Sequence, residues 1–365
     1  MPKYVYDRFI KANTPPKDAS KINFYNGSGS KVYSIPIIHS DKVKNYSFLA
    51  LSDVHITYNT ANEDFQRALA YMENTDCKFA CICGDLTETG DVDELEQYKN
   101  VVVSYAKTKP VYAIGGNHET LREAMTFEKL IPYTGYPMFY SFGVDNQGNK
   151  LAEDVSKTPF VYSDDVKDVY IMMGYVGKEW SYQYFVTTEQ LQWLYETLEA
   201  NRNKRCFIFE HVYPWDDGVG DAERLYNQNY WHTGDNSIGQ AFINLLLHYK
   251  NAILLHGHSH LRYQLQEVDK KANYSSVIGY RSVHISSLAV PRDRLNDGSG
   301  YTNIFAESEG YIVDVYDNYI ILNGRDFIDN EADGHILPIA TYKIDTTIQT
   351  VEANTFTDST GIIKT

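Results

Sequence analysis

The sequence predicts an α/β protein whose strands are buried on both faces. Five short runs are almost entirely apolar, as is typical of such strands; they cover residues 46–51, 78–83, 111–114, 206–209 and 252–255. Between them, apolar residues recur at helical spacing, for example at Phe65, Ala68, Leu69 and Met72. Strand patterns that alternate with helix patterns indicate a layered α/β architecture.

Composition and charge narrow the class of protein further. The chain has 365 residues, of which 43% are apolar and 22% charged, which is a globular composition. Its net charge of −15 repels nucleic acid backbones and anionic lipids, so extended nucleic acid binding is not expected. An anionic substrate therefore needs a local source of positive charge.

The cellular compartment is predicted from the apolar runs and the cysteines. No apolar run reaches the length of about 18 residues that a membrane span needs, and residues 1–7 lack the apolar segment of a secretory signal. Three of the four cysteines lie within residues 77–83 and the fourth is Cys206, all in strand-like runs. This pattern favours buried reduced thiols over a disulfide framework. We therefore expect a cytoplasmic protein.

The chain begins with a polar extension and continues with the main domain. Residues 1–44 are interpreted as an N-terminal extension because prolines and the run 26–30 interrupt them, although residues 32–38 could pair with a sheet edge. The main domain is expected over residues 45–345, with a second amphipathic helix pattern at 191–198. Capping-box spacing indicates three helix starts, at Thr120 with Glu123, Thr187 with Gln190 and Ser237 with Gln240.

From about residue 262 the pattern becomes β-like. Short strand-like runs separated by turn residues occur at 275–278, 282–285, 310–315 and 319–322. No helix pattern is evident there. Residues 346–365 are interpreted as a polar tail that frays.

Each of the five apolar runs is followed by a side chain that can bind a metal ion. In chain order these side chains are Asp53 and His55; Asp85; Asn117, His118 and Glu119; Glu210 and His211; and His256, His258 and His260. In α/β sheets, ligands bind at the carboxyl ends of the strands because the loops there converge. The sequence therefore predicts one metal site at that edge.

The residue types indicate which ions the site takes and how many. Carboxylates, imidazoles and one amide, without a thiolate, suit Mn, Fe, Zn or Co. About seven ligands are too many for one ion, whereas a two-metal site shares a bridging carboxylate. The glycines before Asp85, Asn117 and His258 permit tight turns and close backbone approach. Two such cations would provide the positive charge that a phosphate needs in an acidic protein.

The ordered blocks Asp53-Val54-His55, Gly84-Asp85, Gly116-Asn117-His118-Glu119, His211 and Gly257-His258-Ser259-His260 resemble the calcineurin-like metallophosphoesterase family. The resemblance spans residues 47–260. It implies a four-layer αββα sandwich of two mixed β-sheets with flanking helices, and a binuclear metal centre at the carboxyl ends of the strands. The metal ions would be Mn, Fe, Zn or a mixed pair.

The resemblance also implies a role for each residue. One metal would be bound by Asp53, His55, Asp85 and His260, and the other by Asp85, Asn117, His211 and His258. Asp85 would then bridge the two ions. His118 would bind no metal but would assist the leaving group, while a metal-bridging hydroxide attacks phosphorus in line. Metals lower the pKa of bound water to about 7, and an imidazole titrates in the same range.

Two branches of the family differ at one position. Purple acid phosphatases carry a metal-binding tyrosine three residues after the bridging aspartate, and this chain has Glu88 there. The block Gly84-Asp85-Leu86-Thr87-Glu88 resembles the cyclic-nucleotide phosphodiesterase branch more closely. Glu119 or another carboxylate is expected to orient a metal-binding histidine.

Other residues have simpler interpretations. His39, His232, His248, His284 and His335 lack a motif and are interpreted as surface or structural histidines, and His256 as a packing residue. The aromatic residues Tyr213, Trp215, Tyr226, Tyr230 and Trp231, with Trp180, Tyr182 and Tyr184, either stack on a substrate or pack under loops. Asp216 and Asp217 are interpreted as solvated loop residues rather than extra ligands.

The predicted function is metal-dependent hydrolysis of a phosphodiester or a small phosphomonoester. A non-catalytic interaction or structural module on the same fold is an alternative, but no ligand position and no His118 is lost here. A nuclease is a third possibility, which the net charge of −15 disfavours.

Overall fold

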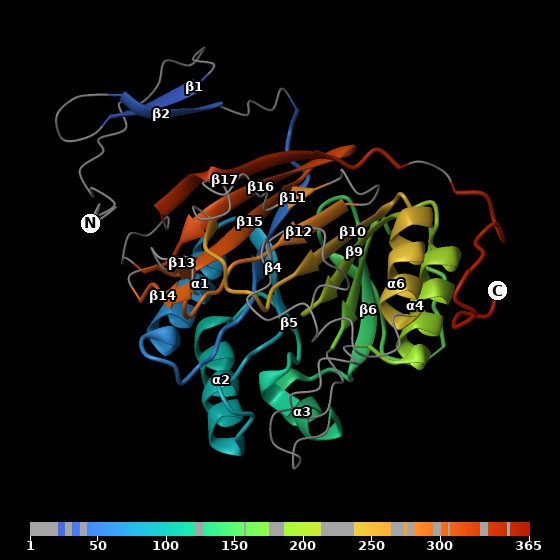
Figure 1. Cartoon of the computed structure of the whole chain (residues 1–365), viewed down its shortest axis with the longest axis horizontal. Coiled ribbons are helices and arrows are strands. Elements are labelled where there is room, and N and C mark those ends of the chain that lie inside the picture. Colours follow the sequence, from blue (N-terminus) through green and yellow to red (C-terminus); the bar gives the residue numbers. More distant parts are fainter. Residues whose placement is uncertain are drawn as a thin grey trace.

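The computed structural model describes residues 21–25, 31–36, 42–120, 127–156, 158–174, 186–212, 237–263, 274–275, 281–294, 301–305, 307–328, 335–348 and 351–365. Two β-sheets face each other, and helices cover their outer faces (Figure 1). Within these ranges, no helix combines the length and the apolar character needed to cross a membrane.

A six-stranded sheet contains the first three predicted strands. In spatial order its strands are β17 (His335–Asp345), β16 (Tyr319–Asp326), β15 (Glu309–Val315), β3 (Tyr46–Leu51), β4 (Cys77–Cys83) and β5 (Val111–Ile114). β3, β4 and β5 are parallel, whereas β15 runs antiparallel to β3, with Tyr311 opposite Ala50. Of the predicted C-terminal strands, 310–315 and 319–322 extend this sheet as β15 and β16, whereas 275–278 and 282–285 correspond to β11 (Tyr274–Ser275) and β12 (Arg281–His284) of the other sheet.

A seven-stranded sheet contains the other two predicted strands. Its spatial order is β11 (Tyr274–Ser275), β12 (Arg281–His284), β10 (Ala252–His256), β9 (Arg205–Glu210), β8 (Asp168–Met173), β6 (Phe139–Val144) and β7 (Lys150–Asp154). β8, β9, β10 and β12 are parallel to one another, and β6 and β7 are antiparallel at one end. Both sheets are therefore mixed.

Helices bury the outer face of each sheet. α1 (Ala61–Asn74) and α2 (Val92–Tyr105) pack on the six-stranded sheet, where Phe65 and Leu69 share a buried cluster with Leu49. α4 (Thr188–Ala200) and α6 (Ser237–His248) pack on the seven-stranded sheet. A short 3-10 helix, η1 (His118–Thr120), and α3 (Phe127–Thr134) follow β5.

The predicted start of α4 is confirmed, because Thr187 and Gln190 form a reciprocal capping box. The start predicted at Thr120 is not found among the described residues, whereas the helix predicted from Ser237 is present. Thr120 is the last residue of η1, and Glu123 lies outside the described residues. Ser237 is the first residue of α6, but its side chain also lies outside them.

The two inner faces pack against each other and form one shared hydrophobic core. Alternate residues of each strand point inward, so that Phe48 of β3 meets Phe207 of β9 with ring centroids 5.5 Å apart. On the opposite face of β9, Ile208 packs toward the helices. This alternation produces the predicted four-layer αββα sandwich.

Two hairpins lie outside the sandwich sheets. β1 (Lys21–Tyr25) and β2 (Lys31–Pro36) pair with each other in the N-terminal extension, so the strand-like stretch predicted there finds its partner within the extension. β13 (Arg292–Arg294) and β14 (Tyr301–Asn303) form the second hairpin.

The polar tail is partly anchored. Phe356 and Ile363 are buried in the core under α4 and α6, and the Phe356 ring centroid lies 5.3 Å from that of Tyr195. The expectation that residues 346–365 fray is therefore wrong for 351–365. Isolated apolar anchors in a polar segment give no periodic signal, which is why the sequence pattern missed them.

Candidate metal centre

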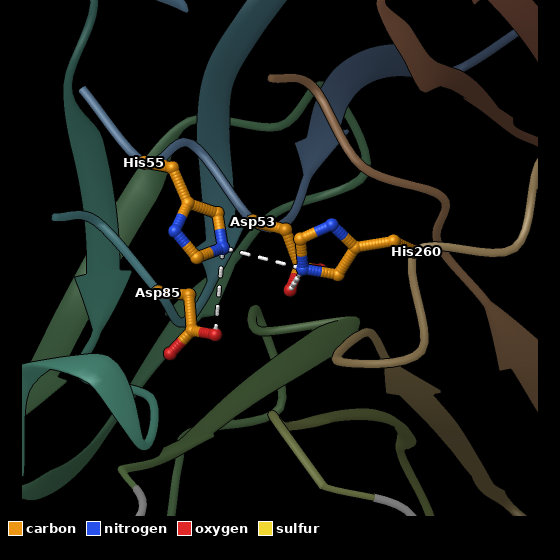
Figure 2. Close-up of side chains that lie close together, drawn as sticks. All are labelled: Asp53, His55, Asp85 and His260. Carbon is orange, nitrogen blue, oxygen red and sulfur yellow. Dashed lines mark hydrogen bonds and ion pairs between the residues drawn. The ribbon is translucent and has the colours of Figure 1, made fainter. Parts of the chain in front are cut away.

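The predicted site residues come together at the carboxyl ends of strands from both sheets. Asp53 and His55 follow β3, Asp85 follows β4, and Asn117 follows β5; His211 follows β9 and His258 and His260 follow β10. Figure 2 shows Asp53, His55, Asp85 and His260 pointing toward one another. The prediction of one common edge is confirmed, and that edge is where the two sheets meet.

The loops that carry these side chains have unusual backbone conformations. Positive φ angles occur at Asp53 (53°), His55 (40°), Asp85 (48°), His258 (72°) and His260 (60°). A non-glycine residue in this region costs about 1–3 kcal/mol and persists only where its surroundings enforce it. Loop-to-loop hydrogen bonds do so, including Asp53 N to Gly84 O at 3.1 Å. Such concentrated strain is typical of functional sites.

Glycines permit the close approach of these loops, as predicted. Gly84 has a φ of 88°, and a Cβ atom at this position would collide with the His211 ring. A Cβ atom on Gly257 would collide with Ser52 and the Asp53 carboxylate. Any larger residue at either position would displace a candidate ligand.

Asp53, His55, Asp85 and His260 form a first group of buried side chains whose ligand atoms all lie within 4.8 Å of one another. His260 Nε2 lies 2.9 Å from Asp53 Oδ1, and His55 Nε2 lies 3.2 Å from His260 Nε2 and 3.6 Å from Asp85 Oδ2. Four ligand atoms are thus directed at one small volume (Figure 2).

The hydrogen bonds of Nδ1 in His55 and His260 determine whether the Nε2 of each ring carries a proton or a lone pair. His55 Nδ1 lies 2.7 Å from the Glu88 carboxylate, and His260 Nδ1 lies 3.2 Å from the carbonyl oxygen of Val290. Because both partners only accept, each Nδ1 donates its proton. When both rings are neutral, each Nε2 atom then carries a lone pair, and the two lone pairs repel each other. A cation between the two Nε2 atoms would bind both lone pairs and remove this repulsion.

A second group contains Asp85, His211 and His258. His211 donates from Nδ1 to the carbonyl oxygen of Cys83 at 2.7 Å, which leaves Nε2 facing the site. That Nε2 lies 3.1 Å from both Asp85 Oδ2 and Asn117 Oδ1. The Asp85 carboxylate is therefore common to both groups, and Asn117 joins the second.

Electrostatics differ between the histidines. Burial lowers the pKa of His258 to about 3, with help from the charge of His211, and burial with the charge of Arg292 lowers that of His260 to about 4. These two rings are neutral at pH 7, as metal ligands must be. Burial lowers the pKa of His211, but the Asp85 carboxylate outweighs burial and raises this pKa to about 10. Without a metal ion His211 is therefore protonated, and a cation bound at Nε2 would replace that proton.

The two buried aspartates are ionised. Burial alone would raise the pKa of Asp53, but His260 holds it well below its usual range. For Asp85, burial is likewise outweighed by the charges of His211 and His118. Two carboxylates that stay negative in a buried site favour a multivalent cation.

His118 lies at the rim of the site, where it forms a third group of possible ligands with His55 and Glu88, whose ligand atoms lie within 4.8 Å of one another. Its ring meets that of His55 edge to face with centroids 4.5 Å apart, and its Nε2 is 3.9 Å from Asp85 Oδ2. Its side chain is 25% exposed, whereas the ligand carboxylates are buried. His118 can therefore contact both the site and an approaching molecule.

The histidine-orienting carboxylate is Glu88, not Glu119. Glu119 accepts hydrogen bonds from Thr87 N at 2.8 Å and Gly116 N at 2.6 Å, and so ties the β4 and β5 loops together. Glu88 instead receives the His55 Nδ1 proton. The sequence places Glu88 at the tyrosine position of purple acid phosphatases and within the Gly84–Glu88 block, but residue spacing does not show that its carboxylate reaches His55.

The remaining histidines and loops are placed as follows. His256 and His284 are buried with ring centroids 5.6 Å apart, and His284 Nε2 lies 2.9 Å from Ser259 Oγ. His248, the last residue of α6, packs against the ring of Phe356 in the C-terminal segment. His39 and His232, the His335 side chain, the aromatic loops around residues 180 and 215, and Asp216 and Asp217 lie outside the described residues.

The donor set fits divalent cations: carboxylate, amide and neutral imidazole atoms converge, and the outer ring nitrogens are held by acceptors. A two-sheet sandwich with such a site at its strand ends defines an α/β sandwich protein with a candidate metal centre. The model of the calcineurin-like phosphoesterase family matches residues 46–262, and the chain belongs to that family.

Solved structures with a similar arrangement have low sequence identity to this chain. Purple acid phosphatase PPD1 from yellow lupin (Lupinus luteus) is 15% identical with a TM-score of 0.46, covering 89% of this chain and 59% of that one. GAP50, the anchor in the inner membrane complex of Plasmodium, is 10% identical with a TM-score of 0.47, covering 87% and 92%. Vacuolar protein sorting 29 from Cryptosporidium parvum is 12% identical with a TM-score of 0.35, covering 82% and 98%.

This chain thus spans 59% of the length of the lupin phosphatase. A search of the curated proteins finds no match. None of these likenesses bears on activity.

Proposed function

We propose that this chain is a phosphoesterase that uses two divalent or transition metal ions, Mn, Fe, Zn or a mixed pair, to hydrolyse a phosphodiester or a small phosphomonoester. The observation that carries the proposal is the position of Asp85, whose Oδ2 lies 3.1 Å from His211 Nε2 and 3.6 Å from His55 Nε2. One carboxylate oxygen thus reaches both ligand groups, as a bridging ligand must.

The two groups of side chains support the following ligand sets. Asp53, His55, Asp85 and His260 would hold one ion, and Asp85, Asn117, His211 and His258 the other. When bound, such a pair supplies a nucleophile at neutral pH and stabilises charge on the phosphoryl oxygens. The protein keeps Asp85 oriented, because Asp85 Oδ1 accepts the backbone N–H of His118 at 2.9 Å and Oδ2 is left for the site.

His118 is proposed as the general acid. Its Nδ1 donates to the carbonyl oxygen of Glu88, so Nε2 is the nitrogen that faces the site. In the imidazolium form, Nε2 donates a proton to the leaving oxygen as the ester bond breaks. Its partial exposure lets the same nitrogen regain a proton from solvent.

The cysteines support a reducing compartment for the enzyme. Cys77, Cys81, Cys83 and Cys206 are buried and free. Since burial raises the pKa of each thiol, these groups stay protonated and unreactive. We place the enzyme in a reducing compartment such as the cytoplasm.

The proposal is tested by elemental analysis of the full chain together with hydrolysis of 4-nitrophenyl phosphate and bis(4-nitrophenyl) phosphate. Asp85→Asn and His211→Ala should abolish metal-dependent turnover. His118→Ala should keep its metal and lose about 10²- to 10⁴-fold in kcat. Undiminished turnover in these variants, or a wild-type protein with less than one metal per chain and no hydrolysis, would contradict the proposal and favour a structural module.

A further inference from the structure

The β13–β14 hairpin lies directly against the metal centre. Arg292 N donates to the carbonyl oxygen of His260 at 2.7 Å, and Arg262 N donates to that of Arg292 at 3.1 Å. Leu261 and Arg292 form a parallel bridge. β13 therefore runs alongside the segment that leaves the last metal-binding loop, and Figure 1 shows the hairpin beside α1.

The pairing within the hairpin indicates which face carries Arg292. Arg292 is directly opposite Asn303 in the antiparallel ladder, so the two side chains share one face. Asn303 Nδ2 donates to the hydroxyl of Tyr58 at 3.1 Å, and Tyr58 N donates to the carbonyl oxygen of His55 at 2.7 Å. The face that carries Arg292 thus turns toward the first metal-binding loop.

Arg292 lies beside the last metal-binding loop, because its backbone N–H donates to the carbonyl oxygen of His260 at 2.7 Å. Arg262 and Arg205 are engaged by Glu307 and Asp168, whereas Arg292, which is half-buried, forms no ion pair with any residue that the structure describes. A guanidinium group remains charged and offers five donors, which suits a phosphate in a protein of net charge −15.

An aromatic pair adjoins this arginine. The rings of Tyr58 and Phe305 stack with centroids 6.0 Å apart and an interplanar angle of 27°. Phe305 lies two residues after Asn303, and its side chain is 47% exposed. An exposed ring backed by a second ring offers a flat apolar surface to a planar group.

We propose that the β13–β14 hairpin with Tyr58 and Phe305 forms the substrate-binding wall of the site. Arg292 binds a non-bridging oxygen of the phosphoester, and Phe305, supported by Tyr58, contacts a planar ring in the ester group. The favoured substrates are therefore phosphoesters that carry an aromatic or heterocyclic ring. This inference rests on the proposed phosphoesterase function and adds its substrate class.

The arginine is tested in the metal-loaded full chain with Arg292→Met. The readouts are KM for 4-nitrophenyl phosphate, the inhibition constant of inorganic phosphate, phosphate binding by calorimetry, and metal content. We expect about 10- to 100-fold weaker binding of phosphate, because a charge-assisted hydrogen bond is lost, with metal content unchanged. Arg292→Lys should recover only part of this loss, since lysine lacks the planar fork.

Arg202→Met is the matched control, because Arg202 is a partly exposed arginine near the end of α4 that pairs with Glu199. It removes the same charge and should leave all four readouts unchanged. Unaltered phosphate binding in an active Arg292→Met enzyme would overturn the role of Arg292 and leave the proposed function standing. A wild-type protein without metal or turnover would instead reject the proposed function.

The aromatic surface is tested with Phe305→Ala on two substrates. The kcat/KM for 4-nitrophenyl phosphate should fall about threefold to tenfold more than that for glycerol phosphate, which lacks a ring. Phe160→Ala is the control, since Phe160 is 42% exposed and its ring packs against Tyr162. Equal losses on both substrates would overturn the ring preference.

Discussion

Glu88 and His55 form a hydrogen bond of 2.7 Å between the carboxylate and Nδ1, and this bond directs His55 Nε2 into the candidate metal centre. Burial would lower the pKa of His55, but the bond to Glu88 raises it above its usual value. The contact thus both orients the ring and strengthens it as a ligand.

We therefore predict that Glu88→Gln weakens metal binding by about 10- to 100-fold. The glutamine amide carries no charge, and its NH₂ group cannot accept the proton of His55 Nδ1. Metal titration of the chelator-treated protein measures this. Glu63→Gln, an exposed position on α1, is the control and should bind metal like the wild type. Equal affinity in both variants would show that Glu88 has no part in holding His55.

Metal removal should destabilise the fold. The site brings Asp53 and Asp85, both ionised, into a buried volume, and a bound ion at 100 times its Kd contributes about 2.7 kcal/mol to the free energy of unfolding. We expect a chelator to lower the wild-type Tm by several degrees and added Mn²⁺ or Zn²⁺ to restore it. Asp85→Asn should respond to neither, and a Tm that chelation leaves unchanged in the wild type would count against a bound metal.

The stability of the fold should fall between pH 5 and pH 8 because of Glu307. Burial raises the pKa of Glu307 to about 7, although Arg262 lies 2.9 Å away. Since the folded pKa exceeds the ordinary value of 4.5, the folded state holds the extra proton in this range. The free energy of unfolding therefore decreases as pH rises, by about 2–3 kcal/mol from this group.

Glu307→Gln should flatten that dependence, which denaturant titrations at pH 5 and pH 8 would measure. The Glu63→Gln variant should keep the wild-type slope. If Glu307→Gln loses stability with pH as steeply as the wild type, Glu307 is not the responsible group.

The contact between the two sheets should be a major source of stability. Phe48 is fully buried, and its ring lies 5.5 Å from those of Phe79 in the same sheet and Phe207 in the opposite sheet. Phe48→Ala should lower the free energy of unfolding by about 3–5 kcal/mol. The exposed Val103→Ala on α2 should change it by less than about 0.5 kcal/mol, and similar losses for both would contradict the two-sheet core.

Much of the sandwich was predictable because doubly buried strands have continuous apolar runs. The run 206–209 and β9, for example, differ by one residue at each end. Which sheet each strand joins was not predictable, since similar runs occur in both sheets. β15 pairs with β3 across some 260 residues of sequence, and no local pattern encodes that pairing. β6 and β8 are also apolar but carry no chemical motif at their ends, so they were not singled out.

The candidate ligands were predictable because their positions follow from strand ends. Their supporting contacts were not. Glu88 lies beside His55 whereas Glu119 bonds to the backbone of Thr87 and Gly116, and backbone pairing brings Arg292 next to His260. Such contacts arise from loop geometry, which residue spacing does not specify.

If Asp85 bridges two ions in one site, both ions should be visible in a crystal of the full chain loaded with Zn²⁺, with elemental analysis to count them and anomalous diffraction to locate them. We expect two ions per chain, both in contact with Asp85, with His55 and His260 on one and His211 and His258 on the other. A single ion, or ions bound away from Asp85, would contradict a bridging role for Asp85.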